Sequence, residues 1–579
     1  MSTKKLEYDS FTLRIPLRDG VWLAADVFTP DRCIAHPLVL EVTPYGRGPD
    51  GINFRDEAAF WVSRGYSMVV ADCRGKGDSQ GEFEAFVNER ADCYDAIEWI
   101  AEQPFCNGSI GMRGSSYTGT NPWLAALDNP AHLKAISPSA STANIRDEIT
   151  WSGGIFMFQH SLTWSSRSRE GHPVLSPDLD WDALLTHRPM IMVDEHLLGK
   201  PSPGFRQMAA YAGGDDVTPP QAFAGTEHSR INVPALAFTG WQDGCLAGTL
   251  AHFQGMRTHS DAGSTQYLVV GPWDHIGAPD GGHDYLTGQP VAPLGDLAIP
   301  AHGFLVAREL ICSFFDHHLK GGPTFPMPHA RLFLTGSNYW FETGDYPPHE
   351  AERRSLYLHS GGQANGLRGD GTLVWEAPDD ETVDEFLHDP LHPVPSQLAD
   401  ATGKMRTLRE WPRDLAPLLD RADVLVYLSS PLSADLSVVG KVVLNLVVAS
   451  DALDADFFCR LEDVAPDGIG MRLGSHGAAR RRLRARAGPT VAEEPYVPNT
   501  AVDLTLDLGG IGHTFLAGHQ LRLSVCSSAY PEAFPNPGTG QPVTTNTAEP
   551  RVARQRVFHD AARPSWLELP VVLLPPTDA

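Results

Sequence analysis

A glycine-flanked pair of serines stands where an apolar run meets a helix-forming run, and this junction constrains the fold more than any other feature. Residues 114–119 read GSSYTG, and the helix-forming residues 122–127 follow. A strand, a sharp turn and a helix in this order are typical of a nucleophile elbow, which presents a hydroxyl at the carboxyl end of a sheet. Small residues flank such a turn because strand and helix pack closely. Thr118 departs from the Gly-x-Ser-x-Gly pattern, and an ordinary turn capped by Ser115 or Ser116 remains the alternative.

Two strands further along the chain end in polar residues that a serine nucleophile requires. The apolar run 233–240 precedes Asp243, and the apolar run 266–271 precedes His275. Residues just past the carboxyl ends of parallel strands share the sheet edge where open α/β folds carry their sites. A serine nucleophile needs a histidine base, and that base needs a carboxylate to orient it. We predict Ser116, Asp243 and His275 as catalytic residues, in the chain order of α/β-hydrolases.

Each of these assignments has an alternative when it is taken alone. An Asp-Gly pair such as Asp243-Gly244 is commonly a plain turn, and His275 is also interpretable as a solvated loop histidine. Asp274 competes with Asp243 for the role of the carboxylate, although it also suits the turn that follows. The three residue types together, in order and on three strand ends, favour the triad.

The N-terminal third alternates strand and helix patterns. Residues 11–27 predict a hairpin that turns at an Asp-Gly pair, and the apolar runs 38–46 and 66–72 suit buried parallel strands. Helix patterns occupy residues 55–64 and 89–101. Because strands alternate with helices, the sequence predicts a doubly wound sheet of the α/β class.

The length of 579 residues is too great for one core and indicates about three domains. Residues 1–145 and 231–348 form the predicted hydrolase core, and residues 146–230 form a helical cap inserted between its two parts. After residue 349 the pattern changes to short strands of alternating polarity that glycine and proline separate. This pattern predicts an all-β sandwich over residues 349–579.

Short motifs spread over nearly the whole chain match one known family. They are PLRDGV at 16–21, TPYG at 43–46, DCRG at 72–75, SQGEF at 79–83, YDAIEW at 94–99, GSSYTG at 114–119, GWQDG at 240–244, GPWDH at 271–275, AGHQLRL at 517–523 and NPGTG at 536–540. With these motifs the chain resembles the cocaine-esterase-like (CocE/NonD) serine hydrolases. That family is related to X-prolyl dipeptidyl-peptidases, glutaryl-cephalosporin acylases and α-amino-acid ester hydrolases. The resemblance implies an α/β-hydrolase core and a jelly-roll-like C-terminal domain.

The resemblance also implies roles for residues around the predicted nucleophile. The phenol of Tyr45 and the backbone N–H of Tyr117 would form the oxyanion hole, and Gly-x-Ser-Tyr-x-Gly would be the family's form of the elbow. An acyl-transfer intermediate requires donors aimed at its developing negative charge. From the residues alone, Tyr45 would be a loop aromatic that packs on the sheet.

Aromatic side chains are concentrated in the predicted cap. Relatives use aromatic residues of this region in an acyl pocket, so Trp151 and Trp164 are interpreted as substrate-binding residues. The alternative is that both tryptophans only hold the cap together.

Composition limits the partners of the chain. The formal net charge of −26 repels nucleic-acid phosphates, and the sequence has no run of eighteen apolar residues that would span a membrane. Because the N-terminus lacks an apolar signal core, we expect a cytoplasmic protein.

The eight cysteines include no Cys-x-x-Cys pair and predict free thiols. Relatives of the family are often dimers or larger, so a homodimer is one of the expected states.

The predicted chemistry needs no metal and no organic cofactor. His317 and His318 are adjacent on a predicted helix and cannot easily face one ion together. The basic run 480–486 predicts a strand with one solvated face rather than an anion-binding patch.

These features predict a serine hydrolase that cleaves carboxylic esters of small molecules through an acyl-enzyme. By the resemblance, an enzyme for amino-acid esters or dipeptides needs acidic residues that bind the substrate ammonium, and residues 244–248 carry none. An amide-cleaving acylase or X-prolyl dipeptidyl-peptidase-type hydrolase is the alternative, and a non-catalytic carbohydrate-binding protein is the distant one. Cys245 stands where the cocaine-cleaving relative has an aromatic residue, so no benzoyl specificity is expected.

Overall fold

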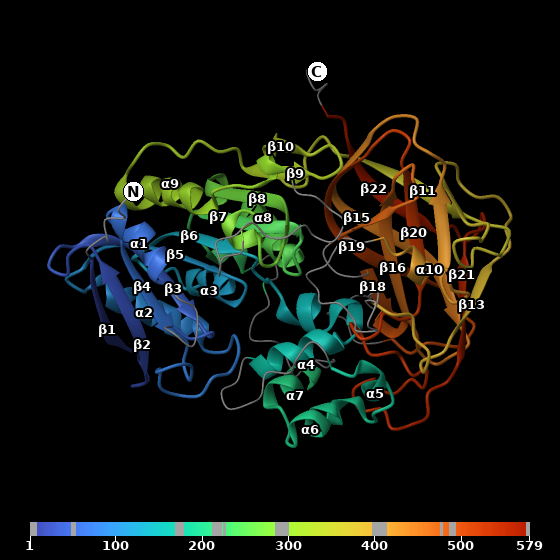
Figure 1. Ribbon diagram of the computed structural model, residues 1–579, viewed down its shortest axis with the longest axis horizontal. Coiled ribbons are helices and arrows are strands. Elements are labelled where there is room, and N and C mark those ends of the chain that lie inside the picture. The colour runs from blue at the N-terminus through green and yellow to red at the C-terminus, as the bar shows by residue number, and fades with distance from the viewer. Residues whose placement is uncertain are drawn as a thin grey trace.

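The fold has an α/β part, a helical part and an all-β part, which Figure 1 shows in chain order from blue to red. The computed structural model describes residues 8–47, 54–167, 179–210, 223, 227–283, 300–396, 414–474, 479–485 and 494–574. The predicted architecture, an α/β-hydrolase core with a helical cap and a C-terminal β-sandwich, is confirmed.

A ten-stranded mixed sheet forms the α/β part, in the order β1-β2-β4-β3-β5-β6-β7-β8-β9-β10. All neighbours from β4 to β9 are parallel, and β1, β2 and β10 are antiparallel additions at the edges. The strands are β1 (Asp9–Pro16), β2 (Trp22–Thr29), β3 (His36–Thr43), β4 (Ser67–Asp72), β5 (Cys106–Ser115), β6 (Leu133–Ser139), β7 (Ala235–Gln242), β8 (Gln266–Asp274), β9 (Ala330–Leu334) and β10 (Tyr339–Thr343).

Helices cover both faces of this sheet, as parallel strands require. The helices α2 (Glu89–Ala101), α3 (Tyr117–Ala126) and α8 (Leu246–His259) pack on one face through Ile97, Trp123 and Met256. On the opposite face, α1 (Arg55–Ser63) and α9 (Ala307–Lys320) pack through Trp61 and Phe314. Alternate residues of one strand enter the two cores, with Leu40 in the first and Val39 in the second.

The hairpin predicted over residues 11–27 is confirmed. The register of β1 and β2 runs from Asp9 opposite Thr29 to Pro16 opposite Trp22. Gly20 closes the turn with a φ of 87°, which a residue without a Cβ adopts at little cost.

The helical part packs against the all-β part through a shared apolar core. Phe158 of α4 contacts Tyr530 and Phe534, with ring centroids 6.5 and 5.3 Å apart. Backbone hydrogen bonds join the same two parts, from Ile191 N–H to the Thr544 carbonyl oxygen at 2.9 Å. The elements of the helical part are a π-helix (Arg146–Thr150), α4 (Phe158–Arg167), α5 (Trp181–Leu185), α6 (Val193–Leu198), α7 (Pro203–Ala210) and 3₁₀ turns at Ser152–Gly154, Met190–Met192 and His228–Arg230.

The all-β part encloses one core of aliphatic and aromatic residues. Its strands follow the path β13-β21-β15-β22-β11-β12-β14-β20-β16-β17, with β18 on β16 and β19 on β15. Their bounds are β11 (Glu352–His359), β12 (Thr372–Val374), β13 (Asp384–His388), β14 (Leu425–Ser429), β15 (Leu436–Ser450), β16 (Asp456–Val464), β17 (Gly470–Leu473), β18 (Ala479–Arg482), β19 (Val502–Phe515), β20 (Gln520–Cys526), β21 (Ala553–Phe558) and β22 (Trp566–Val572), with one short helix, α10 (Ala416–Leu419). Further 3₁₀ turns lie at Gly263–Thr265, Ala278–Asp280, Ala301–Gly303 and Leu483–Ala485.

A buried polar network crosses the all-β part. Ser360 Oγ lies 3.1 Å from His559 Nε2, and His559 Nδ1 lies 2.9 Å from a Glu381 oxygen. One oxygen of Asp384 accepts hydrogen bonds from Ser360 Oγ and from the Tyr427 phenol, at 2.8 and 2.7 Å, and lies 2.9 Å from His559 Nε2. The exposed fractions of Asp384 and His559 are 0 and 1 %.

The basic run 480–486 begins in a strand, as predicted: burial alternates along β18, where Arg481 is half-buried. Arg480 and Arg482 lie on the buried face of this strand. They form ion pairs with Glu532 and Asp454 at 2.6 and 2.5 Å. Alternation along the strand points both guanidinium groups inward, where carboxylates of neighbouring segments neutralise them.

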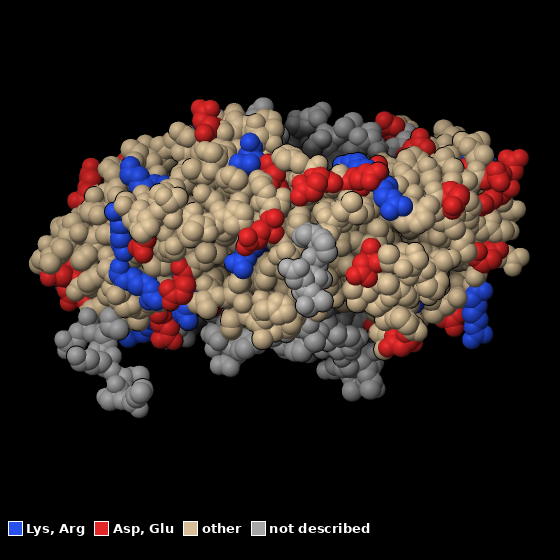
Figure 2. Space-filling view, turned by 90° about the horizontal axis from the view of Figure 1, so that it is seen from above, with Lys and Arg blue, Asp and Glu red and all other residues tan. Residues whose placement is uncertain are grey.

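All eight cysteines are free thiols, as predicted. Within the described ranges, no helix combines the length and the apolar content needed to cross a membrane. Figure 2 shows acidic and basic side chains scattered singly and in small groups over one face of the molecule.

Candidate active site

Ser116 occupies a strained turn between β5 and α3. Its φ and ψ are 61° and −122°, a conformation that costs a residue with a Cβ on the order of 1–3 kcal/mol. The side chain makes no capping hydrogen bond to the helix. An ordinary turn capped by Ser116 is therefore excluded, and the hydroxyl is free to face other groups.

The neighbouring glycines are required by close backbone approach. A Cβ on Gly114 would lie 2.1 Å from the Thr118 carbonyl oxygen, and a Cβ on Gly119 would lie 2.2 Å from the Ser139 carbonyl oxygen. Thr118 replaces the usual second glycine because its hydroxyl is used within the turn: Ser115 N–H donates to Thr118 Oγ1 at 2.7 Å. The sequence pattern thus departs from the common motif without loss of the turn.

The three predicted catalytic side chains meet at the carboxyl edge of the sheet. His275 Nε2 lies 2.9 Å from Ser116 Oγ, and His275 Nδ1 lies 2.7 Å from Asp243 Oδ1. Ser116, Asp243 and His275 directly follow β5, β7 and β8. In the parallel sheet β7 and β8 are neighbours, and β6 lies between β5 and β7. The imidazole therefore links hydroxyl and carboxylate across chain separations of 159 and 32 residues.

Asp243 is fully buried and ionised by its surroundings. Its Oδ2 accepts the Thr239 hydroxyl at 2.8 Å, and its Oδ1 accepts the Cys245 N–H at 2.9 Å. Burial favours the neutral carboxyl, but the charge of His275 and these hydrogen bonds hold the pKa of Asp243 below its ordinary value. A charged carboxylate fixes the tautomer and the orientation of the imidazole.

His275 is the exposed member of the group, with 36 % of its side chain accessible. Burial would lower the pKa of His275, but the negative charge of Asp243 outweighs it and raises that pKa well above the ordinary histidine value. The pair is therefore suited to accept a proton and to stabilise the resulting cation.

Asp274, the rival carboxylate, serves the turn after β8. Its Oδ1 accepts hydrogen bonds from the backbone N–H groups of Ile276 and Gly277 at 3.1 and 2.8 Å. The imidazole bonds to Asp243 instead.

Tyr45 lies in the loop after β3 and faces the nucleophile. Burial raises the pKa of its phenol, and hydrogen bonds with Ser116 and Trp164 oppose that rise. Arg47 anchors this loop through ion pairs with Asp72 at 3.0 Å and with Asp26. The sequence analysis missed Arg47; the short spacing from the TPYG motif was the available signal.

Tyr117 has a buried phenol, and its backbone begins α3 directly after Ser116. The phenol donates to Glu89 at 2.5 Å and accepts the Phe86 N–H at 2.9 Å. Burial raises the pKa of Glu89 to about 7. As the first residue of α3, Tyr117 has a backbone N–H with no intrahelical acceptor, at the positive end of the helix dipole.

The two cap tryptophans occupy different environments. Trp151 is 2 % exposed, and its indole donates to the Met208 carbonyl oxygen at 2.8 Å inside the cap core. This position favours the alternative in which Trp151 holds the cap together. Trp164 of α4 is half-buried, stacks on Tyr117 at a centroid distance of 6.4 Å and lies near enough to the Tyr45 phenol to oppose the rise in its pKa.

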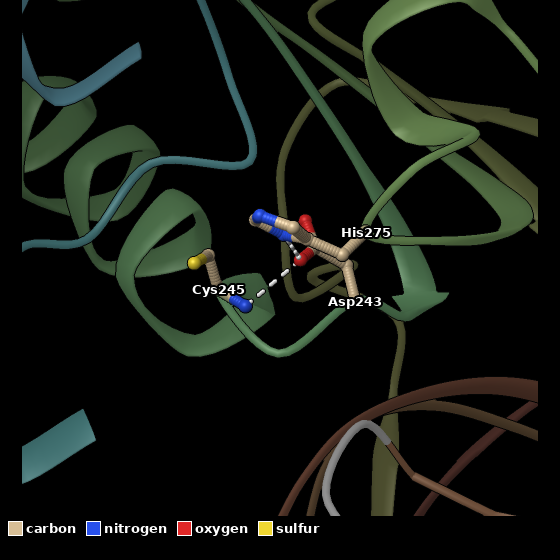
Figure 3. A group of neighbouring side chains, drawn as sticks. All are labelled: Asp243, Cys245 and His275. Carbon is tan, nitrogen blue, oxygen red and sulfur yellow. Dashed lines mark hydrogen bonds and ion pairs between the residues drawn. The ribbon is translucent and has the colours of Figure 1, made fainter. Parts of the chain in front are cut away.

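Cys245 is a neighbour that the sequence analysis placed only by resemblance. It is 6 % exposed just before α8, and its sulfur lies within 4.8 Å of a ring nitrogen of His275. Figure 3 shows its backbone nitrogen and the His275 ring joined to the same Asp243 carboxylate. His317 and His318 stand apart from this group on α9, and His317 Nδ1 lies 3.3 Å from the Gly322 carbonyl oxygen.

Two family models match most of the chain. The model described as "X-Pro dipeptidyl-peptidase (S15 family)" matches residues 19–277, and "X-Pro dipeptidyl-peptidase C-terminal non-catalytic domain" matches residues 325–568. Ser116, Asp243 and His275, the predicted catalytic residues, all lie within the first range.

Similar proteins cover the chain from end to end. Cocaine esterase of Rhodococcus sp. (strain MB1 Bresler) is 31% identical over 96% of this chain and 97% of its own. An aminopeptidase from a marine sediment archaeon, Thaumarchaeota archaeon, has a TM-score of 0.85 at 26% identity, over 99% of this chain and 98% of its own. An α-amino acid ester hydrolase has a TM-score of 0.83 at 25% identity over the same shares.

Proposed function

The chain belongs to the cocaine-esterase-like (CocE/NonD) family of serine hydrolases, and on this premise we propose that it cleaves carboxylic esters through an acyl-enzyme formed on Ser116. The observation that carries the proposal is the pair of hydrogen bonds at His275, 2.9 Å to Ser116 Oγ and 2.7 Å to Asp243. Membership of a hydrolase family leaves the non-catalytic, carbohydrate-binding alternative without support.

In the proposed reaction, His275 takes the proton of Ser116 as the hydroxyl oxygen attacks the ester carbonyl. Asp243 stabilises the imidazolium that forms. The Tyr45 phenol and the Tyr117 N–H donate to the oxyanion, and each such donor contributes about 2.7–4 kcal/mol to the transition state. His275 then protonates the leaving alcohol, and water repeats the sequence on the acyl-enzyme.

Substitution of the nucleophile tests this proposal. Ser116→Ala is expected to abolish hydrolysis of small esters and labelling by a fluorophosphonate probe. The neighbouring Ser115→Ala is the matched control, because Ser115 bonds to Thr118 in the turn through its backbone N–H and carbonyl, which the substitution keeps. Near-normal turnover by Ser116→Ala, with unchanged thermal unfolding, would end the proposal.

Amide cleavage is the second candidate, and the match to the S15 peptidase family favours it. A substrate ammonium would need a carboxylate, and the residues directly after Asp243 supply none. Glu148 approaches this region, but both its oxygens accept the Ala143 N–H, at 3.3 and 3.2 Å. A panel of esters and amides, with and without an α-amino group, discriminates the candidates: faster cleavage of the uncharged acyl esters supports the first.

A further inference from the structure

Three ligand atoms of different chemistry converge beside the nucleophile. A carboxylate oxygen of Asp243, the sulfur of Cys245 and a ring nitrogen of His275 all lie within 4.8 Å of one another. Figure 3 shows the three side chains together, and Cys245 directly precedes the first residue of α8. Among the described residues, this is the group whose spacing suits a metal ion.

The backbone holds this group in place. Cys245 N–H donates to Asp243 Oδ1 at 2.9 Å, and Leu246 N–H donates to the Asp243 carbonyl oxygen at 3.0 Å. The turn from β7 into α8 therefore carries the thiol next to the carboxylate. His275 comes from the end of the adjacent strand β8. Little reorganisation is needed, because rigid elements supply all three ligands.

Sulfur, imidazole nitrogen and carboxylate oxygen are the ligands that zinc prefers. With zinc–ligand bonds of about 2.0–2.3 Å, tetrahedral ligands lie roughly 3.3–3.8 Å apart. No two of the three ligand atoms are more than 4.8 Å apart, so the widest spacing has to shorten by at most about 1–1.5 Å to reach that value. Magnesium and calcium prefer oxygen ligands and do not suit a site with a thiol.

We propose that Asp243, Cys245 and His275 form an inhibitory site for zinc. Binding releases one proton from the Cys245 thiol as the sulfur–zinc bond forms. If Nδ1 of His275 gives its lone pair to the ion, the single ring proton lies on Nε2; if Nε2 binds the ion, the lone pair of Nε2 is used by zinc. In either case the imidazole has no lone pair for the Ser116 proton, and the serine loses its base. The inhibition rests on the proposed triad, whereas the metal binding does not.

Zinc titration of ester hydrolysis tests the proposal. Buffered zinc should inhibit the wild-type enzyme, EDTA should restore activity, and magnesium should have no effect. Cys245→Ala should raise the inhibitory zinc concentration on the order of 100-fold, relative to its own uninhibited rate. Cys312→Ala is the matched control, because Cys312 is a buried thiol 3.9 Å from the Asp316 carboxylate at a distant position. An equal inhibitory concentration in Cys245→Ala and wild type would overturn the proposal.

Cobalt binding gives a readout that does not depend on activity. Cobalt in this site should show a thiolate charge-transfer band, which Cys245→Ala and Cys245→Ser lose and Cys312→Ala keeps. Ser116→Ala should keep the band although it lacks esterase activity. A wild-type enzyme that is active but shows no such band contradicts the metal site alone. An active Ser116→Ala variant that shows the band contradicts the proposed triad alone.

Discussion

Two Ser-His-carboxylate groups with similar distances lie in different parts of this molecule. Ser116, His275 and Asp243 stand at the edge of the α/β sheet, and Ser360, His559 and Glu381 lie inside the all-β part. In the second group Asp384 accepts the serine hydroxyl at 2.8 Å and approaches the same imidazole nitrogen at 2.9 Å.

The comparison shows that the distances within a triad are insufficient for nucleophilic chemistry. Ser116 has a strained backbone, an adjacent helix N-terminus and an exposed base. Ser360 donates its hydroxyl proton to the buried carboxylate of Asp384. The first group is arranged to release a proton, and the second to neutralise buried charge.

The largest expected difference concerns activity after removal of each imidazole. His275→Ala should reduce kcat/KM for ester hydrolysis on the order of 10⁴–10⁶-fold, because the base is lost. His559→Ala should leave the activity per folded molecule unchanged. Steady-state kinetics with active-site titration measure both, and similar losses in the two variants would remove the distinction.

The two substitutions should affect stability in the opposite order to their effects on activity. His559→Ala leaves Asp384 and Glu381 without their shared cation, which should lower the free energy of unfolding by about 3–5 kcal/mol. His275→Ala affects a partly exposed side chain and should cost less. Urea unfolding, monitored with a probe in the all-β part, measures the free energy of unfolding of both variants. A more stable His559→Ala protein would show that the network does not stabilise the fold.

The phenols of Tyr45 and Tyr427 give a second comparison of the two groups, with smaller expected effects. Tyr45→Phe should lower kcat about 10²–10³-fold through loss of an oxyanion donor. Tyr427→Phe should leave kcat unchanged and cost about 1–3 kcal/mol of stability, since Asp384 loses one donor. Kinetics and unfolding of the two variants test this pair, and an unchanged kcat in Tyr45→Phe would contradict the oxyanion role.

The smallest expected effect is that esterase activity and the stabilisation by His559 change in opposite directions as the pH rises. Burial would lower the pKa of His559, but its two carboxylates raise it. Its stabilisation is therefore complete below the unfolded value of about 6.5 and is lost as pH rises through the folded pKa. The kcat/KM of ester hydrolysis should rise as the pH increases through the pKa of His275, because His275 must be neutral to act as a base. The pH profile of kcat/KM and the pH dependence of the wild-type minus His559→Ala stability measure the two trends.

The sequence carried enough information for the architecture and for the central contacts of the site. Periodic apolar runs and strand-end residues predicted the sheet and the position of His275, because parallel strands bring their carboxyl ends together. Local patterns did not reveal which long-range partner a polar side chain meets. The basic run predicted a strand with one solvated face, but it did not reveal that Glu532 and Asp454 pair with Arg480 and Arg482 on the buried face.

The two tryptophans of the cap show the same limit. Trp151 and Trp164 have similar sequence surroundings, but the fold of the cap places one in its core and one against Tyr45. The relation of Cys245 to His275 also depends on how two strands and a helix meet. Such contacts need the third dimension, since residues far apart in the chain make them.

The helix α4 connects the two regions compared above. Phe158 near its start packs on Tyr530 and Phe534 of the all-β part, and Trp164, six residues later, stacks on Tyr117 beside the nucleophile. The C-terminal third therefore supports one end of a helix that reaches the candidate site, although it supplies none of the proposed reacting groups.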